Sequence, residues 1–232
     1  MRPVRIYALP RAVDADGIAE GQTPGAAGDL TLDGALVVDG VAVIRRSDTD
    51  ASGRPYSRIG QTVTVTSDGD DSGVTFTVTG LDQDGQEYSE AITGPNATSA
   101  SSTGYFSEVT SVVIDGAGTG SITVGIAATF ATPSIPLDHY IGDGVAQAVV
   151  LGGTATYTVQ HTFDNVQVQT WKDGYSWDAA GGNWLDHDSS DFVDGTATAD
   201  GNLQFIPKAT RLKCTAWTNG TVEYDVISAR MV

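Results

Sequence analysis

The sequence predicts an all-β protein with two antiparallel β-sandwich domains, Ig-like or jelly-roll-like, behind an extended N-terminal arm. Its 28 glycines and eight prolines stand among Thr, Ser, Val and Asp, which is typical of short strands and tight turns. Apolar and polar residues alternate in many short runs, and no segment shows helical periodicity. The 232 residues suffice for two domains of about 100 residues each. We expect the arm over residues 1–17, the first domain over 18–131 and the second over 132–232.

The first domain begins with short strands and continues with longer alternating runs. The segment 30–44 predicts two strands with turns at its two Asp-Gly pairs. The runs QTVTVT (61–66) and VTFTVT (74–79) are joined by a cluster rich in Asp and Gly, which predicts a hairpin packed on a second sheet. The turn GLDQDGQE leads to a strand at 87–93, and the segment 106–126 predicts a final hairpin.

The second domain follows a proline-punctuated linker, ATPSIP (131–136). Its strands are again short and rich in β-branched and aromatic residues. We expect them at 145–150, 154–160, 166–171, 203–206, 210–217 and 221–227.

The last two strands of each domain match at an offset of 100 residues without gaps. Inward apolar positions coincide, as where Ile114 falls on Cys214, and the turn residues Gly120 and Gly220 coincide too. The match predicts that both domains close with a similar hairpin.

Composition and charge exclude several functions. Twelve basic against 29 acidic residues give a net charge of −17, which opposes binding to nucleic acid or to an anionic membrane surface. The lone Cys214 excludes an internal disulfide and a multi-thiolate zinc site, and strand alternation places it on a buried face. The first 13 residues lack the apolar run of a signal peptide, and no stretch has the length of a membrane span. We therefore expect synthesis and assembly in the cytoplasm.

The basic residues are segregated from the acidic ones. Arg2, Arg5 and Arg11 stand in the first 13 residues without an acidic partner, whereas residues 59–171 contain twelve Asp or Glu and no Lys or Arg. One interpretation is a solvated tail. The other is an arm that lies on an acidic neighbour, such as the next identical subunit, by strand addition or draping.

No catalytic residues, metal site or cofactor are predicted. The three histidines lie in different contexts, and no serine stands in a Gly-x-Ser-x-Gly elbow. Asp82, Asp84 and Glu87 resemble the start of a calcium loop but lack a glutamate at the twelfth position, so a turn explains them.

One stretch of the second domain concentrates aromatic residues. Trp171, Trp177 and Trp184 are three of the four tryptophans within fourteen positions, and Tyr175 lies among them. They are expected to plug the end of the sandwich or form a subunit contact. The alternative is a platform for a sugar ring, with nearby aspartates bonding its hydroxyls.

Two sets of segments resemble virion structural proteins of tailed bacteriophages. The first comprises GQTPGAAGDLTLDGALVVDGVAV, TVTVTSDGDDSGVTFTVTGLDQDGQEYSEAITGPN and FSEVTSVVIDGAGTGSITVG. The second comprises TYTVQHTFDN, WLDHDSSDF and TATADGNLQFIPKATRLKCTAW. Together they cover most of residues 20–228. The resemblance implies a non-enzymatic component of a virus particle.

The leading hypothesis is a capsid decoration or cement protein that binds the major capsid protein on the outside of the head and stabilises the shell. Arg2, Arg5 and Arg11 would contact the neighbour, and copies on a symmetric lattice would form a homo-oligomer, most simply a trimer. Within the same class, the alternative is a head–tail, collar or fibre-base component with other virion proteins as partners. In a different class, the alternative is a carbohydrate-binding adhesion module.

Overall fold

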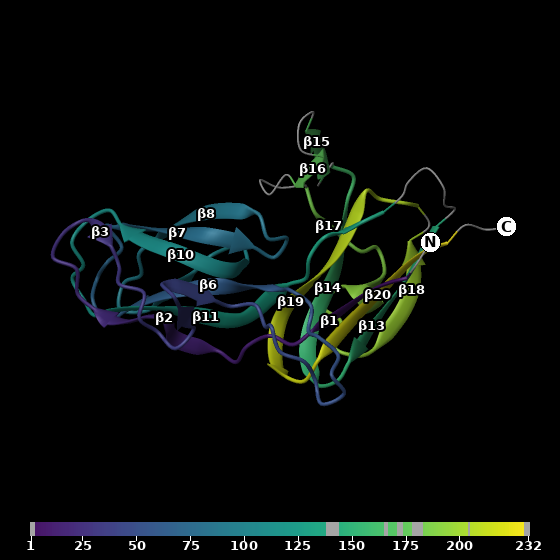
Figure 1. Cartoon of the computed structure of the whole chain (residues 1–232), viewed down its shortest axis with the longest axis horizontal. Helices are drawn as coiled ribbons and strands as arrows, with labels where there is room; N and C mark the ends of the chain where they lie inside the picture. Colours follow the sequence, from purple (N-terminus) through teal and green to yellow (C-terminus); the bar gives the residue numbers. More distant parts are fainter. Residues whose placement is uncertain are drawn as a thin grey trace. The chain divides into compact units, whose positions relative to one another are not determined.

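The computed structural model describes residues 3–137, 144–164, 167–170, 174–177, 183–203 and 205–229, without the side chains of 167–170, 174–177 and 228–229. Every regular element in these residues is a β-strand except one short 3₁₀ helix, and the strands form large antiparallel sheets (Figure 1). The all-β prediction is therefore confirmed.

Contacts divide the chain into two compact units. The first unit contains residues 11–46 and 59–130, and the second contains the described parts of 1–10, 47–58 and 131–232.

The first unit has two layers of strands. In one layer β10 pairs with β7 on one side and with β3 and β5 on the other, while β8 extends β7 and β4 extends β5. In the other layer β6 lies beside β11, β2 pairs with β11 and β9 pairs with β6. The strands are β2 (Asp14–Gln22), β3 (Gly28–Asp29), β4 (Val37–Val38), β5 (Val41–Val43), β6 (Gly60–Ser67), β7 (Thr75–Asp82), β8 (Glu87–Thr93), β9 (Ser99–Ser101), β10 (Phe106–Ile114) and β11 (Ile122–Ala131).

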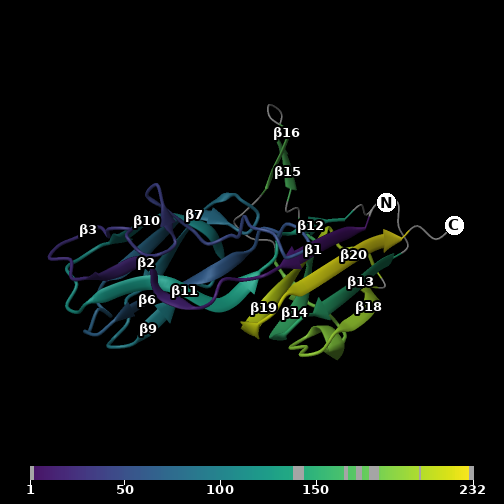
Figure 2. The same cartoon turned by 60° about the horizontal axis from the view of Figure 1, so that its bottom comes forward.

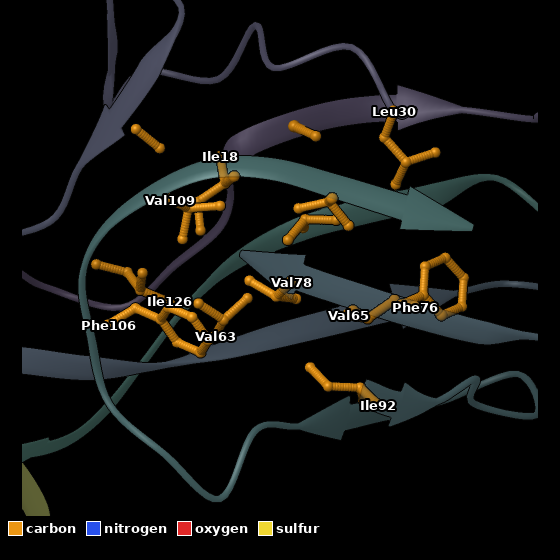
Figure 3. Close-up of a cluster of buried hydrophobic side chains, with 14 of the residues drawn as sticks. Ile18, Leu30, Val63, Val65, Phe76, Val78, Ile92, Phe106, Val109 and Ile126 are labelled. Atoms are coloured by element: carbon orange, nitrogen blue, oxygen red, sulfur yellow. The ribbon is translucent and has the colours of Figure 1, made fainter. Parts of the chain in front are cut away.

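An apolar cluster fills the space between these layers (Figure 3). Because side chains of a strand alternate between its two faces, the runs read from the sequence deliver every second residue to this cluster. Val63 and Val65 come from β6, and Phe76 and Val78 come from β7, all four fully buried. The threonines between them, such as Thr77, are only half-buried. The predicted strands at 61–66, 74–79 and 87–93 are thus confirmed.

Two expected hairpins of this unit are wrong. Strands β6 and β7 do not pair with each other, and neither do β10 and β11; each pair is split between the two layers, which meet where Phe106 of β10 pairs with Gln61 of β6. Each connecting loop crosses from one layer to the other, and hydrogen bonds join the two loops. The carboxylate of Asp71 accepts a hydrogen bond from the N–H of Thr119 at 2.7 Å, and that of Asp68 accepts one from the N–H of Ser121 at 2.6 Å.

The hairpins with short turns are present. Strands β7 and β8 pair over seven residue pairs after the turn at Asp82–Gln86. Strands β4 and β5 are joined at Asp39 and Gly40, whose φ angles of 52° and 80° are those that a two-residue hairpin turn requires.

The second unit also has two sheets. One has the strand order β1-β20-β13-β18, visible in Figure 2, and the other has the order β17-β14-β19 with β12 added beside β19. Strands β15 and β16 pair with each other. The elements are β1 (Val4–Ala8), β12 (Ile135–Pro136), β13 (Gly144–Leu151), β14 (Thr154–Thr162), β15 (Gln167–Thr170), β16 (Gly174–Trp177), β17 (Leu185–Asp186), η1 (Ser190–Phe192), β18 (Ala199–Leu203), β19 (Ala209–Asn219) and β20 (Val222–Ala229).

The match at an offset of 100 residues has a structural counterpart. Leu212, Cys214 and Tyr224 are fully buried, like Val112 and Ile114 in the first unit. However, β19 and β20 belong to different sheets, as β10 and β11 belong to different layers. The shared feature is therefore a crossing between layers, and the expected closing hairpin is wrong in both units.

The N-terminal segment differs from the arm expected over residues 1–17. All five residues of β1 pair with β20 of the same chain, and β2 begins at Asp14. Ile6, Tyr7 and Ala8 are all buried, so both faces of β1 are covered at this end. Strand addition does occur, but the acidic strand that receives it belongs to this chain.

Candidate functional site

The expected interaction residue Arg5 is engaged within its own chain. Its Nε and Nη2 atoms donate to the two carboxylate oxygens of Asp225 at 2.7 and 2.8 Å, and Nη1 lies 3.8 Å from Glu223. The hydrogen bond and charge of Asp225 raise the pKa of Arg5. This bidentate pair lies at a directly opposed position of the β1–β20 ladder, so it fixes the strand's register.

The loop formed by residues 47–58 covers the outer edge of β1. The N–H of Tyr7 donates to Ser57 Oγ at 3.0 Å, and the N–H of Ser57 donates to the carbonyl of Tyr7 at 2.7 Å. The guanidinium carbon of Arg54 lies 3.2 Å from the Tyr7 ring centroid, and Arg54 Nη2 donates to Glu223 at 2.9 Å. The Tyr56 ring stacks on the Tyr7 ring, and the two ring centroids are 5.1 Å apart.

Arg11 is also used inside the chain, in the first unit. Its N–H donates to Gln61 Oε1 at 2.8 Å and its Nε donates to the carbonyl of Ile44 at 2.9 Å. Arg2 lies outside the described residues. The two described arginines of the expected arm therefore act as intramolecular anchors.

The aromatic stretch is described in part. Trp171 lies outside the described residues, and Tyr175 and Trp177 are described only as backbone of β16. Trp184 is half-buried, and the guanidinium carbon of Arg211 lies 4.1 Å from its ring centroid. Arg211 in turn donates two hydrogen bonds to Gln160 Oε1, at 2.9 and 3.0 Å.

A second group of aromatic rings lies at the end of β14, and the sequence analysis did not predict it. His161, Phe163 and Phe205 contact each other with ring centroids 5.2 to 5.7 Å apart, and Phe163 is 52% exposed. The period-2 spacing of His161 and Phe163 was the available signal. Phe205 had none, because it is brought close by the chain segment that precedes β19.

The structure also brings together two histidines that lie far apart in sequence. His161 and His187 are 3% and 6% exposed, and each carries one buried ring nitrogen without a hydrogen-bond partner. Burial lowers the pKa of both, and the charge of His161 lowers that of His187 further, against the opposing effect of Asp188. His139 lies outside the described residues.

Carboxylate side chains accept hydrogen bonds from the backbone N–H groups of turns and loops. Asp82 Oδ1 accepts hydrogen bonds from the N–H groups of Asp84 and Gln86 at 2.9 and 2.8 Å, the pattern of a turn, and burial raises its pKa. Within the described residues, no three His, Cys, Asp or Glu side chains gather as metal ligands would. A polar hollow of about 540 Å³ lies along residues 190–200.

Cys214 is fully buried in β19, as strand alternation predicted. Burial raises the pKa of its thiol to about 12, and Sγ donates to the carbonyl of Ala216 at 3.1 Å. At neutral pH the group stays a thiol, which favours a packing role over nucleophilic chemistry.

Comparison with known proteins yields no relatives: no family model matches the chain, and no curated protein matches it. Among the described residues, no helix is long and apolar enough to cross a membrane.

Proposed function

We propose that the chain is a non-enzymatic structural component of a tailed-bacteriophage particle, and that it decorates the outside of the head by binding the major capsid protein. The observation that carries the proposal is the resemblance of the two sets of segments quoted above. The first set covers residues 21–43, 62–96 and 106–125, which make up most of the first unit. We interpret each unit as a β-sandwich domain, an architecture suited to repeated assembly on a shell.

The contacts of Arg5 and Arg11 argue against docking through these two side chains. Both side chains bind groups of their own chain, so they support the subunit instead of reaching a neighbour. What remains for docking is the acidic surface, which suits a basic partner patch. Such contacts are individually weak, at about 0–1 kcal/mol for an exposed ion pair, and gain strength from many copies on one shell.

The copy number per purified particle tests this proposal. Quantitative mass spectrometry against the major capsid protein should give a ratio near one per capsid subunit, or a simple fraction such as one third. A ratio of a few per cent would favour a collar, head–tail or fibre-base component. Absence of the chain from particles would contradict both structural roles.

A carbohydrate-binding role is the second candidate, supported by the exposed ring of Phe163 and the half-buried ring of Trp184. Arg211 lies over the Trp184 ring, and aromatic rings of this kind are those on which sugars stack. Glycans from host surfaces should then quench tryptophan fluorescence, and Trp184→Ala should abolish the quenching. No quenching across a broad glycan panel would exclude this role for the isolated chain.

A further inference from the structure

His187 is held in one protonation state by its hydrogen bonds. It directly follows β17, and its own N–H donates to the carbonyl of Val159 in β14 at 2.9 Å. Its Nδ1 accepts a hydrogen bond from the N–H of Ser189, also at 2.9 Å. The neutral ring therefore carries its proton on Nε2, which is buried without a partner. Its ring centroid lies 4.6 Å from that of Phe192.

Protonation of His187 is incompatible with this arrangement. The imidazolium carries a proton on both nitrogens, so Nδ1–H would face the N–H of Ser189 and the hydrogen bond would be lost. Ser189 is the N-cap of η1, and its own Oγ accepts from the N–H of Asp191. Loss of the bond to Nδ1 thus loosens the start of η1. The Nε2–H donor would remain buried and unpartnered, now as part of a charged ring.

His161 adds a second buried imidazole at the same place. Its Cα is opposite that of Leu185 in the β14–β17 ladder, its Nδ1 has no partner, and Phe163 and Phe205 contact its ring. A proton on Nδ1 would again create a charged donor among apolar rings.

Few charges oppose this effect. Asp186 on β17 and Asp188 after it favour the imidazolium forms, but both carboxylates are exposed to solvent. Asp191 on η1 is exposed as well. Arg211 on β19 donates a hydrogen bond to Gln160. Its positive charge repels an imidazolium and therefore does not favour protonation of either histidine.

We propose that His187, with His161 beside it, is a proton-sensitive latch that holds residues 187–192 against β14 at neutral pH and releases them on acidification. Release exposes Phe192, which is 1% exposed in the closed form. The Phe192 ring also covers the backbone of β18, since a Cβ built on Gly201 would lie 2.7 Å from it. Opening the latch therefore also uncovers one face of β18, the last strand of the β1-β20-β13-β18 sheet, at Gly201. The latch is a property of the chain alone and is independent of the proposed place in a particle.

The direction of the pH effect follows from the lowered pKa values of both histidines. The closed form binds protons less readily than the open form, in which a histidine titrates near its usual value of about 6.5. The closed form is therefore fully favoured above that pH and loses stability as the pH falls below it. Each histidine increases the opening equilibrium by up to about tenfold per pH unit, until its lower closed-state pKa is reached.

Amide hydrogen exchange of the full chain tests the latch. Protection of the N–H groups of His187 and Ser189, corrected for intrinsic exchange, should fall at least about tenfold between pH 7 and pH 5. The N–H of Val78 in the first unit serves as the reference. In His187→Asn, the amide oxygen can replace Nδ1 as acceptor two residues before Ser189, but it does not titrate. This variant should show a smaller fall, because only His161 still titrates, and His161→Phe should likewise keep only the response of His187. The double variant should change less than about twofold.

Two results would overturn the proposal: protection that does not change with pH in the wild type, or an equal acid response in His187→Asn. If the Asn variant does not fold, nitrogen chemical shifts of the wild-type imidazoles decide the matter. A doubly protonated His187 ring with the Ser189 N–H still protected would contradict the latch.

Discussion

The two units differ in how their cores treat polar groups. The first unit buries polar side chains such as Gln61, Asp71 and Asp82 beside its apolar cluster, and each of them has hydrogen-bond partners. The second unit buries Gln147, His161, His187 and Thr210 alongside its apolar residues. Among the described residues, the three buried side-chain atoms without a hydrogen-bond partner are Gln147 Nε2, His161 Nδ1 and His187 Nε2, all in the second unit. Among the described residues, the buried polar atoms without a partner thus gather in the second unit.

Glu90, in the middle of β8 of the first unit, has a fully hydrogen-bonded carboxylate. Glu90 accepts hydrogen bonds from the N–H groups of Thr103 and Gly104 at 2.7 and 2.9 Å and from the hydroxyl of Tyr88 at 3.1 Å. Burial alone would raise the pKa of Glu90, but the bonds from Thr103 and Gly104 outweigh it and hold the pKa below its usual range. Fully bonded carboxylates stabilise loops, whereas unpartnered imidazoles leave a group free to titrate.

Truncation of a core ring in the first unit should have the largest effect. Phe106 is fully buried and lies 5.1 Å from the ring of Tyr88, so Phe106→Ala should reduce the free energy of unfolding by about 3–5 kcal/mol. Denaturant unfolding followed by circular dichroism measures this loss. The matched control is Phe163→Ala in the second unit, where the ring is 52% exposed and the loss should stay below about 1 kcal/mol. Similar losses in both variants would contradict the contrast between a dense core and an exposed ring cluster.

Removal of the loop-binding carboxylate should have an intermediate effect. Glu90→Ala leaves the N–H groups of Thr103 and Gly104 without their acceptor, so we expect a loss of about 1–2 kcal/mol at pH 7. Because the folded-state pKa of Glu90 is lowered, its contribution is present above about pH 4.3 and disappears as the pH falls through the lower folded value. The exposed Glu87 of the same strand is the control, and Glu87→Ala should change stability by less than about 0.5 kcal/mol. A Glu90→Ala penalty that does not shrink as the pH falls below about 4.3 would contradict this explanation.

Replacement of the unpartnered amide in the second unit should have a smaller effect. In Gln147→Met the hydrogen bond from Tyr224 to Gln147 Oε1 is lost, but so is the buried Nε2 group without a partner. Tyr224 keeps its contact with the hydroxyl of Thr210, at 2.6 Å. The two changes oppose each other, so thermal unfolding should report a difference below about 1 kcal/mol. A loss above about 2 kcal/mol would show that the amide is satisfied after all.

The strands were predictable from the sequence, but their partners were not. Alternation in QTVTVT and VTFTVT reports which face of each strand is buried, because this depends on local spacing. Which strand lies alongside is decided by long-range contacts, such as the bond from the Thr119 N–H to Asp71, 48 residues away. Short turns were predicted correctly, since the Asp39-Gly40 pair carries its own conformational signal.

The candidate sites were less predictable for the same reason. The charge distribution singles out Arg5 as a residue that contacts a neighbour, yet in the structure its acidic partner is Asp225 of the same chain, 220 residues later. Strand addition was expected from the extended sequence, but the sequence could not say whether the receiving strand was its own or a neighbour's. His161 and His187 carry no shared motif, and their proximity follows from the pairing of β14 with β17.

Thiol labelling perturbs the chain least, because its main measurement uses the unsubstituted protein. Cys214 is buried in the second unit, and burial raises its pKa to about 12, against about 8.5 for an unperturbed thiol. Alkylation of the native chain at pH 8 should therefore be at least about a thousandfold slower than that of the unfolded chain. Labelling then reports opening of the second unit, and it should accelerate in Val159→Ala, which removes part of the same core, but not in the exposed Phe163→Ala. Rapid native labelling would mean that this core opens readily even where its side chains are apolar, and the contrast between the units would then lie in packing as well as in polar groups.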